Sequence, residues 1–471
     1  MVLRVFNTMT GTEEEFKPIN GNRVSIFVCG PTVYDYSHIG HARTYVAYDV
    51  VVRYLQFKGY STFYLMNITD VDDKIIDRSK ERSIPPLTLS ENFTKEFYRD
   101  LALLKISSVN LFAKASEHIP EIIDQITTLL KKDYAYGVNG DIYFNISKFP
   151  DYGRLSHQNP EELKKHRIEP DPRKKDPSDF SLWKSRGRDE LGWESPWGWG
   201  RPGWHIEDTA ITGTYFGPQY DIHGGAIELV FPHHEAEIAQ AESASGKKPL
   251  VKYWIHTGMV NVKGQKMSKS LGNFVTIREV LEKYSPNVLR IFFTSSHYRS
   301  PIDYNQTNLE NAQENLRRIT NAYAKANDAL KNAKLSEDRI DAEFSQVTGD
   351  FRRQFVEAMD DDFNTPVALA VMLSFSRKLE TYTDQRPAEK ALSEAAATLR
   401  DFSTILGIDM SDGRVQQPEI IEDLMNLILD LRGGARKRND WETADKIRER
   451  LGALKISLED TPEGTRWQRI G

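Results

Sequence analysis

The chain has 471 residues and 39% hydrophobic residues, which is enough apolar material for a core and a length typical of about three or four domains. It contains no run of about 18 apolar residues, so we expect no membrane span and no signal peptide. It contains one cysteine, Cys29, so we expect no internal disulfide and a reducing, cytoplasmic location. The net charge of −6 gives no argument for RNA binding from bulk charge, so such contacts have to come from local patches.

The first 70 residues read as a strand, a loop, a helix and a second strand. Continuous apolar runs cover 24–28 and 61–68, and the segment 45–58 has apolar residues at helical spacing. This pattern indicates a βαβ unit in a parallel sheet, whose ligands bind at the carboxyl ends of the strands.

The loop before that helix carries His38-Ile39-Gly40-His41. Unpaired backbone N–H groups and the helix dipole collect phosphate at a helix N-terminus, and imidazoles can donate hydrogen bonds to phosphate oxygens. A four-residue pattern is weak evidence when it stands alone.

The middle of the chain interrupts the α/β pattern. We interpret residues 115–200, which are charged and rich in proline and tryptophan, as an insertion between two halves of one nucleotide-binding domain. Strand-like runs resume at 213–216 and 227–231, and a helix is expected after Pro232.

His233 and Glu237 lie four residues apart near that helix start, so both side chains project from one face. Their spacing suits two ligands of one metal ion.

A second motif, Lys266-Met-Ser-Lys-Ser270, lies on a glycine-flanked loop. Its two ammonium groups can close over a polyphosphate, although a loop of lysine and serine is usually only solvated. Because the two motifs occur in this order, more than 220 residues apart, together they predict an apparatus that activates ATP.

The rest of the chain predicts helices. Residues 308–335 and 351–406 are rich in helix formers at the spacing of a helical bundle, and a linker near 409–417 leads to a small domain with a strand-like run at 456–458. Basic residues surround Trp441 in that domain. Cations contact phosphates and an exposed indole stacks on unpaired bases, but the interspersed acidic residues also suit an ordinary exposed helix.

The two motifs resemble, without change, the H-I-G-H and K-M-S-K-S signatures of the class I aminoacyl-tRNA synthetases. Other segments are similar to the cysteinyl-tRNA synthetase family over essentially the whole chain, namely 27–35, 67–74, 203–207, 221–225, 231–235 and 435–460. The resemblance implies an α/β fold in which a Rossmann-like parallel-sheet catalytic domain is split by an insertion and followed by a helical bundle and a small C-terminal anticodon-binding domain. The expected bounds are 1–114 and 201–258 for the catalytic halves, 115–200 for the insertion, 259–306 for the lysine-loop junction, 307–410 for the bundle and 417–471 for the last domain.

The resemblance also implies a metal site. In the family, the positions matching Cys29, His233 and Glu237 are zinc ligands, and the metal binds the substrate thiol. Zinc favours a thiolate over a hydroxyl, whereas size alone would separate cysteine from serine by only about 1–3 kcal/mol. The fourth ligand is usually a second cysteine, and this chain has Asp208 there.

Asp208 leaves alternatives open. A carboxylate can ligate zinc, which would give a harder and more negative set of one sulfur, one nitrogen and two oxygens. Asp208 can instead cap a helix beginning near Thr209. His205, His223 and His234 are nearby, and one of them can replace Asp208 or orient a ligand.

Roles for other residues follow from the resemblance. His38 and His41 would contact the phosphates of ATP, and Lys266 and Lys269 would stabilise the charge that moves to pyrophosphate. The resemblance also places Gly40, Ser268 and Ser270 at ATP, Thr69 and Trp204 at the substrate cysteine, and Arg436, Trp441 and Asp445 at the tRNA anticodon. Thr69 and Trp204 also suit ordinary turn and core positions.

The expected activity is ATP-dependent activation of L-cysteine to cysteinyl-adenylate, followed by transfer to the 3′-terminal adenosine of cysteine tRNA. We expect one Zn²⁺ per chain, Mg²⁺ with ATP, and a monomer that contacts no membrane. One alternative is a paralogue that acylates a small-molecule amine, as mycothiol ligases do. The other is a catalytically silent RNA- or metal-binding relative. The roughly 160 residues after Glu310 argue against the first, and the intact signatures argue against the second.

Overall fold

The computed structural model describes residues 2–158, 172–267, 272–332, 341–385, 387–410, 418–454, 456–461 and 464–469. The chain divides into two compact units, Met1–Met410 and Ser411–Gly471. Among the described residues, no helix has the length and hydrophobicity needed to cross a bilayer.

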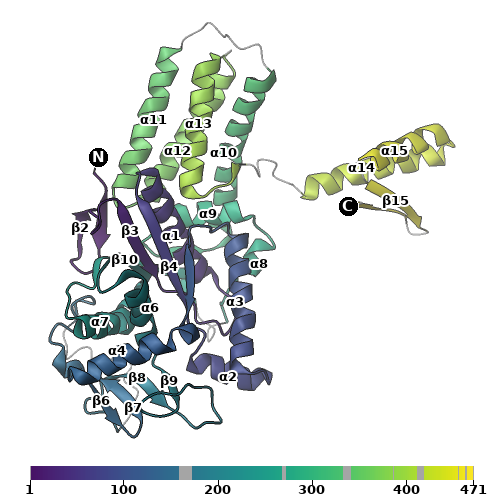
Figure 1. Ribbon diagram of the computed structural model, residues 1–471. Coiled ribbons are helices and arrows are strands. Elements are labelled where there is room, and N and C mark those ends of the chain that lie inside the picture. The colour runs from purple at the N-terminus through teal and green to yellow at the C-terminus, as the bar shows by residue number, and fades with distance from the viewer. Residues whose placement is uncertain are drawn as a thin grey trace. The chain divides into compact units, whose positions relative to one another are not determined.

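A five-stranded sheet lies at the centre of the first unit (Figure 1). Its order is β11-β10-β3-β4-β5, and all four pairings are parallel. The strands are β3 (Arg23–Val28), β4 (Ser61–Ile68), β5 (Leu111–Lys114), β10 (Tyr220–Ala226) and β11 (Val251–Thr257). Because β3 lies between β4, which follows it, and β10, which comes much later, the strand order reverses there. Ligands of such sheets bind at the carboxyl ends of the strands at that point.

The two faces of the sheet carry different helices because side chains alternate along each strand. Ile26 and Val28 of β3 belong to a core with α1 (Ile39–Phe57), α3 (Pro86–Leu103) and α9 (Pro286–Thr294). Phe27 and Cys29 lie in the core on the other face, which contains residues of α4 (Ile119–Lys131), α6 (Ile206–Phe216) and α7 (Glu235–Ser245). The parallel α/β prediction is therefore confirmed, and Cys29 lies on the α6 and α7 side.

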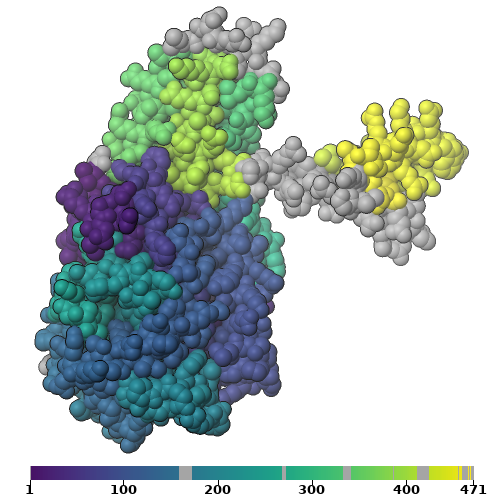
Figure 2. Space-filling view, in the orientation of Figure 1, coloured from purple at the N-terminus to yellow at the C-terminus, as the bar shows by residue number. Residues whose placement is uncertain are grey.

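The segment interpreted as an insertion contains α4 and an antiparallel sheet. Its strands are β6 (Ala135–Val138), β7 (Asp141–Phe144), β8 (Phe180–Ser185) and β9 (Gly200–Pro202), in that order. Trp183 is fully buried and meets Trp197 edge to face at 5.9 Å, so these two tryptophans serve packing. In the space-filling view this segment lies at one end of the first unit (Figure 2).

Three sequence expectations for the chain after the insertion are wrong, namely the strands at 213–216 and 227–231 and the helix start near Thr209. Residues 213–216 end helix α6, which begins at Ile206 and not near Thr209. Residues 227–231 form the 3-10 turn Ile227–Leu229 and enter the π turn Val230–His234, and the helix after Pro232 is α7. The true strand, β10, includes Gly224, where a β-carbon would overlap the Tyr48 ring. Glycine weakens a strand signal, and this close packing explains why glycine is required.

The remaining elements of the first unit surround these sheets. A hairpin of β1 (Arg4–Asn7) and β2 (Thr12–Glu15) precedes the central sheet, and α2 (Asp73–Arg82) precedes α3. Strand β12 (Val260–Val262) pairs with β13 (Gln265–Lys266) and with β14 (Ile302–Tyr304), and α8 (Ile277–Leu281) follows the lysine motif.

The predicted helical bundle is present in the first unit. It consists of α10 (Gln306–Asn332), α11 (Ala342–Asp360), α12 (Thr365–Thr383) and α13 (Glu389–Leu406). The second unit contains α14 (Pro418–Lys437), α15 (Trp441–Ala453) and the antiparallel pair β15 (Ile456–Thr461) and β16 (Gly464–Arg469). The strand-like run at 456–458 is therefore the start of β15.

Candidate active site and metal centre

A cleft of about 390 Å³ opens at the carboxyl ends of the central strands. Segments far apart in sequence line it, namely Cys29 and the loop after β3, the start of α1, Trp204, Ala226 with Glu228 and Leu229, Gly258 to Val260, and Met267 with Phe274. The histidine motif and the start of the lysine motif therefore meet at one cavity.

The histidine motif forms the N-terminus of α1. His38 is the N-cap, and its Nδ1 accepts hydrogen bonds from the backbone N–H groups of Gly40 and His41 at 3.1 and 3.4 Å. The backbone N–H of His38 in turn donates to His41 Nδ1 at 3.3 Å. The two rings stack with centroids 3.8 Å apart.

These contacts fix which ring nitrogen carries the proton when each ring is neutral. Burial and the neighbouring His38 lower the pKa of His41 well below its ordinary value, so its imidazole is neutral. Since Nδ1 accepts in each ring, the proton of a neutral ring lies on Nε2. Both histidines can therefore donate from Nε2, as binding of phosphate oxygens requires.

Only the beginning of the lysine motif is described. Lys266 ends the β12–β13 hairpin, and its Nζ lies 2.5 Å from Glu228 Oε1 at the cleft. Met267 lines the cleft, and a β-carbon on Gly40 would lie 3.5 Å from Met267 Cε. The predicted ATP-site residues Ser268, Lys269 and Ser270 lie outside the described residues.

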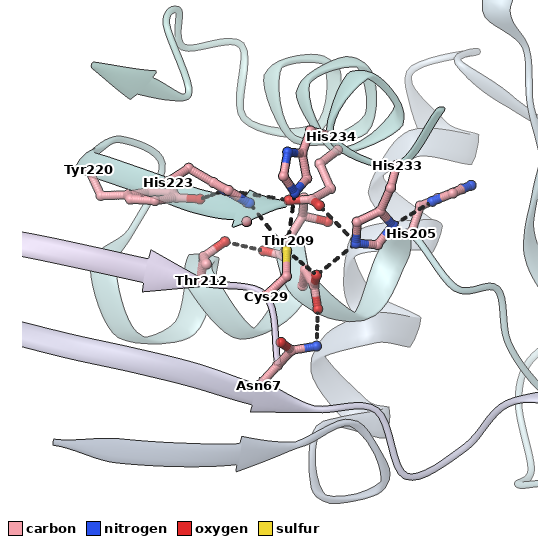
Figure 3. Close-up of polar contacts among 12 residues, drawn as sticks. Cys29, Asn67, His205, Thr209, Thr212, Tyr220, His223, His233 and His234 are labelled. Carbon is pink, nitrogen blue, oxygen red and sulfur yellow. Dashed lines mark hydrogen bonds and ion pairs between the residues drawn. The ribbon is translucent and has the colours of Figure 1, made fainter. Parts of the chain in front are cut away.

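The four predicted metal ligands come together beside the cleft, and Figure 3 labels two of them, Cys29 and His233. One donor atom from each of Cys29, Asp208, His233 and Glu237 lies within 4.8 Å of every other, and all four residues are buried. Asp208 Oδ2 is 3.5 Å from Cys29 Sγ and 3.0 Å from His233 Nε2, which is 3.1 Å from Glu237 Oε1. We call these four residues the first ligand set.

The charges of this cluster call for a cation. Burial, then the neighbouring Asp208 and Glu237, raise the pKa of the Cys29 thiol well above its ordinary value. Burial, then Asp208 and Glu207, also raise the pKa of Glu237. Within the described part of the chain, neither carboxylate oxygen of Glu237 has a hydrogen-bond partner. Although His233 Nε2 lies 3.1 Å from Oε1, a buried carboxylate without a hydrogen bond is stabilised by a proton or a metal ion, so the residues present fit a divalent cation.

The helix-cap interpretation of Asp208 is wrong. The N-cap of α6 is His205, which makes no side-chain cap hydrogen bond, and Asp208 lies inside the first turn. Its side chain is 1% exposed and accepts a hydrogen bond of 2.5 Å from Asn67 Nδ2. Asp208 therefore points into the cluster.

A second group of possible ligands shares two members with the first. Cys29, His223, His234 and Glu237 also bring one donor atom each within 4.8 Å of one another, and we call them the second ligand set. His205 Nδ1 lies 2.8 Å from His233 Nδ1, so His205 can orient that ring. His256, which contacts His234 Nδ1 at 2.8 Å, was not singled out from the sequence. Its place near the carboxyl end of β11 was the available signal.

The two candidate cysteine-binding residues differ in position. Trp204 lines the cleft, is 39% exposed, and stacks on His233 with centroids 4.2 Å apart. Thr69 is 2% exposed and donates a hydrogen bond of 2.5 Å to Glu207 Oε1. Trp204 thus joins the cleft to the metal cluster, whereas Thr69 holds a buried carboxylate.

The three candidate anticodon residues lie on neighbouring helices of the second unit. Arg436 is in the last turn of α14, and its guanidinium carbon lies 5.9 Å from the ring centre of Trp441. Trp441 is 55% exposed at the start of α15, and Asp445 is exposed one turn later. The structure therefore presents an indole with a cation beside it, which is suited to base stacking.

Comparison with known proteins gives family matches over most of the chain. Residues 15–314 match the model described as the class I (C) tRNA synthetase catalytic domain, and residues 354–411 match the DALR domain. A cysteine–tRNA ligase of Thermococcus gammatolerans is 46% identical over 475 residues, and one of Pyrococcus horikoshii is 47% identical over the same length. Each alignment covers 100% of both chains.

A solved structure supports the fold. The methionyl-tRNA synthetase of Mycobacterium tuberculosis, in complex with methionyl-adenylate, aligns with a TM-score of 0.59 at 15% identity. The alignment covers 82% of this chain and 89% of that one.

Proposed function

Because the chain belongs to the cysteine–tRNA ligase family, we propose that it activates L-cysteine with ATP and transfers the cysteinyl group to the 3′-terminal adenosine of cysteine tRNA. The observation that carries this proposal is the shared cleft. It joins the histidine motif, the first residues of the lysine motif and the Cys29 cluster at one edge of a parallel sheet. One end of the cleft suits ATP phosphates, and the other suits a thiol.

The first step is an in-line displacement in which the cysteine carboxylate attacks the α-phosphorus and pyrophosphate leaves. Such a step depends on placement and charge neutralisation. His38 and His41 donate from Nε2 to phosphate oxygens, while Lys266 and Lys269 neutralise the charge that moves to pyrophosphate. Lys266 has to leave Glu228, and this exposed ion pair costs little to break. Gly40, Ser268 and Ser270 complete the ATP site, and Mg²⁺ accompanies ATP.

The buried cluster binds the side chain of the substrate. Cys29, Asp208, His233 and Glu237 supply donors for one Zn²⁺, whose affinity for a thiolate separates cysteine from serine. Trp204, stacked on His233, borders the side-chain site, and Thr69 supports it through Glu207.

The second unit carries tRNA recognition. Arg436, Trp441 and Asp445 contact the anticodon, with Trp441 stacking on a base beside the Arg436 guanidinium. We assign residues 1–114 and 201–258 to the catalytic domain, 115–200 to the insertion, 259–306 to the lysine-loop junction, 307–410 to the bundle and 417–471 to anticodon binding. The enzyme acts as a monomer in the cytoplasm.

Two reactions measured on the full chain test the proposal. Cysteine-dependent exchange of pyrophosphate into ATP reports activation, and charging of cysteine tRNA reports transfer. We expect both, together with one bound zinc ion per chain and strong discrimination against serine. Exchange without charging would indicate the small-molecule ligase alternative, and absence of exchange in the zinc-loaded protein would refute the proposal.

A further inference from the structure

Arg43 is a buried arginine in α1, two residues beyond the histidine motif. It is 1% exposed, and it pairs with no carboxylate of the described residues. Burial lowers the pKa of its guanidinium to about 10, so the group stays charged at neutral pH. A buried charge is costly unless polar partners surround it. The partners of Arg43 therefore indicate its role.

Four backbone carbonyls surround this guanidinium. It donates hydrogen bonds to the carbonyl of Phe293, at the end of α9, and to that of His297 at 2.6 Å. It also contacts the carbonyls of Ser296 and Ser300, at 3.3 and 3.4 Å. The end of a helix carries partial negative charge on such carbonyls, which a cation neutralises. We call residues 295–301, which connect α9 to β14, the junction loop.

The junction loop supports a wall of the cleft. The backbone N–H of Gly258 donates to the Tyr298 carbonyl at 2.8 Å, and that of Ile302 donates to the Met259 carbonyl at 2.9 Å. A β-carbon on Gly258 would overlap the carbonyl of Ser300, so the wall and the loop are in direct contact. Gly258 and Met259 line the cleft. A shift of the junction loop therefore moves this wall.

The same support extends to the lysine motif. Strand β14, which follows the junction loop, pairs with β12, and β12 pairs with β13, which ends at Lys266. In the turn of this hairpin, the backbone N–H of Gly264 donates to Asp303 Oδ1 of β14 at 2.6 Å. The histidine motif lies at the start of α1, the helix that carries Arg43. Arg43 therefore connects the histidine motif, through the junction loop, to the base of the lysine motif.

A second residue holds the junction loop independently of α1. Asp362, in the connection between α11 and α12, accepts hydrogen bonds from the Tyr298 hydroxyl and from Arg299 Nε, each at 2.6 Å. These bonds hold two side chains of the loop, whereas Arg43 holds its backbone carbonyls. Loss of Arg43 therefore leaves the loop attached to the bundle but frees it from α1.

We propose that Arg43 is a positioning residue for cysteine activation, which fixes the histidine motif and the lysine motif at the right separation by holding the junction loop against α1. The inference rests on the proposed function, because it requires both motifs to act on one polyphosphate. A residue that only capped α9 would need only the carbonyls at the end of that helix. Arg43 also reaches the carbonyl of Ser300, close to the start of β14.

Exchange kinetics of the full chain test the proposal. Arg43→Lys keeps the positive charge, but a compact ammonium cannot span four carbonyls as a guanidinium does. We expect kcat for cysteine-dependent pyrophosphate exchange to fall by about tenfold or more, because a misplacement of about 1 Å can cost ~100-fold. The KM for cysteine should stay within about twofold of the wild type, because the cluster proposed to bind the thiol is built on other elements.

Arg290→Lys is the matched control. Arg290 is 0% exposed and donates to three backbone carbonyls, those of Leu104, Lys105 and Leu406. Among the described residues that line the cleft, none is a partner of Arg290. The substitution should lower the free energy of unfolding in urea titrations and leave kcat within about twofold of the wild type. An equal loss of kcat in both variants would make Arg43 an ordinary structural residue.

Amide hydrogen exchange gives a readout that needs no substrate. Arg43→Lys should speed deuterium uptake in peptides that cover β12 and β14, because their hydrogen-bonded N–H groups open more often when the junction loop is released. Arg290→Lys should leave uptake in these peptides unchanged. If Arg43 only capped α9, the faster uptake would be confined to α9.

The proposal is overturned by a folded Arg43→Lys enzyme with kcat within about twofold of the wild type, or by unchanged uptake in β12. If that variant does not fold, Gly258→Ala separates the wall from the junction loop with Arg43 intact. A slowed exchange reaction in Gly258→Ala supports the proposal, and an unchanged kcat overturns it. A wild type without pyrophosphate exchange refutes the proposed function, whereas deuterium uptake of the variants still decides whether Arg43 holds β12.

Discussion

Gly40 belongs to the histidine motif and lies near Met267 of the lysine motif, so replacing it with alanine tests how tightly the two motifs fit together. Its backbone is not in the left-handed region, so alanine brings no backbone strain there. The added β-carbon would lie 2.8 Å from both Cε1 and Nδ1 of His38 and 3.5 Å from Met267 Cε. The 3.5 Å distance to Met267 Cε is an ordinary van der Waals contact, whereas the two 2.8 Å distances to His38 are too short. The His38 ring therefore has to move, while Met267 can stay.

The size of the effect follows from these distances. Restoring an ordinary contact of about 3.4 Å requires the ring to shift by roughly 0.6 Å, and a misplacement of about 1 Å can cost ~100-fold in rate. We expect Gly40→Ala to lower the rate of cysteine-dependent pyrophosphate exchange by about tenfold or more. Weakening of the His38 cap should cost about 1 kcal/mol of unfolding free energy.

Steady-state exchange measured against ATP and against cysteine is the assay. Gly213→Ala is a matched control, because Gly213 lies in α6 with nothing within 4 Å of an added β-carbon. It should be silent in activity and can be slightly stabilising. A folded Gly40→Ala enzyme that exchanges pyrophosphate within twofold of the wild type would refute the reasoning.

Trp441→Ala should lower charging of cysteine tRNA by about 1–3 kcal/mol of transition-state stabilisation and leave exchange intact, whereas Trp441→Phe should retain charging; a parallel fall in exchange would mark a structural role. Lys269→Ala should slow exchange by about 100-fold or more with cysteine affinity unchanged, and a loss confined to cysteine binding would contradict it. Gly407→Ala should lower the free energy of unfolding, measured by urea titration, by about 3–5 kcal/mol. Gly407 has a φ of +69°, and an added β-carbon would overlap the guanidinium of Arg290, which pairs with buried Asp49. An unchanged unfolding midpoint would contradict this. Burial alone would raise the pKa of Asp49, but Arg290 and Arg53 outweigh it and lower the pKa. The stabilisation is therefore present above the ordinary value near 4 and is lost as pH falls through the lowered pKa. Asp49→Asn should flatten that acid limb of thermal unfolding, and an unchanged limb would argue against the pair.

Local sequence patterns predicted the elements that position the ATP site. The apolar run 61–68 is β4 to the residue, and the apolar spacing of 45–58 lies within α1 except for its last residue, Lys58. The predictions of these two elements are correct because burial on one or both faces gives their apolar residues a clear pattern along the sequence. The pattern failed at β10, where close packing against Tyr48 requires glycine and removes the β-branched residues by which a strand is recognised.

The candidate metal site was predictable in part. The sequence predicted that His233 and Glu237, four residues apart, share one face. Although His233 lies in the turn before α7 and Glu237 lies within α7, both side chains reach the cluster. His256 and Asn67 were not predicted as partners, because the strand register that brings them to the same edge is set by long-range pairing. Sequence spacing alone carries no information about which strands become neighbours.

The loop that joins β3 to α1 links two parts of the candidate site. Cys29 stands at its beginning and His38 at its end, so one short segment connects the cluster proposed to bind the substrate thiol with the helix proposed to bind the ATP phosphates. With the thiol held at the cluster, one more methylene, as in homocysteine, would displace the carboxylate by about 1 Å from the position that the cysteine carboxylate takes, and a displacement of that size can cost ~100-fold in rate. If both proposed roles hold, the length of this segment disfavours a longer thiol by reach alone.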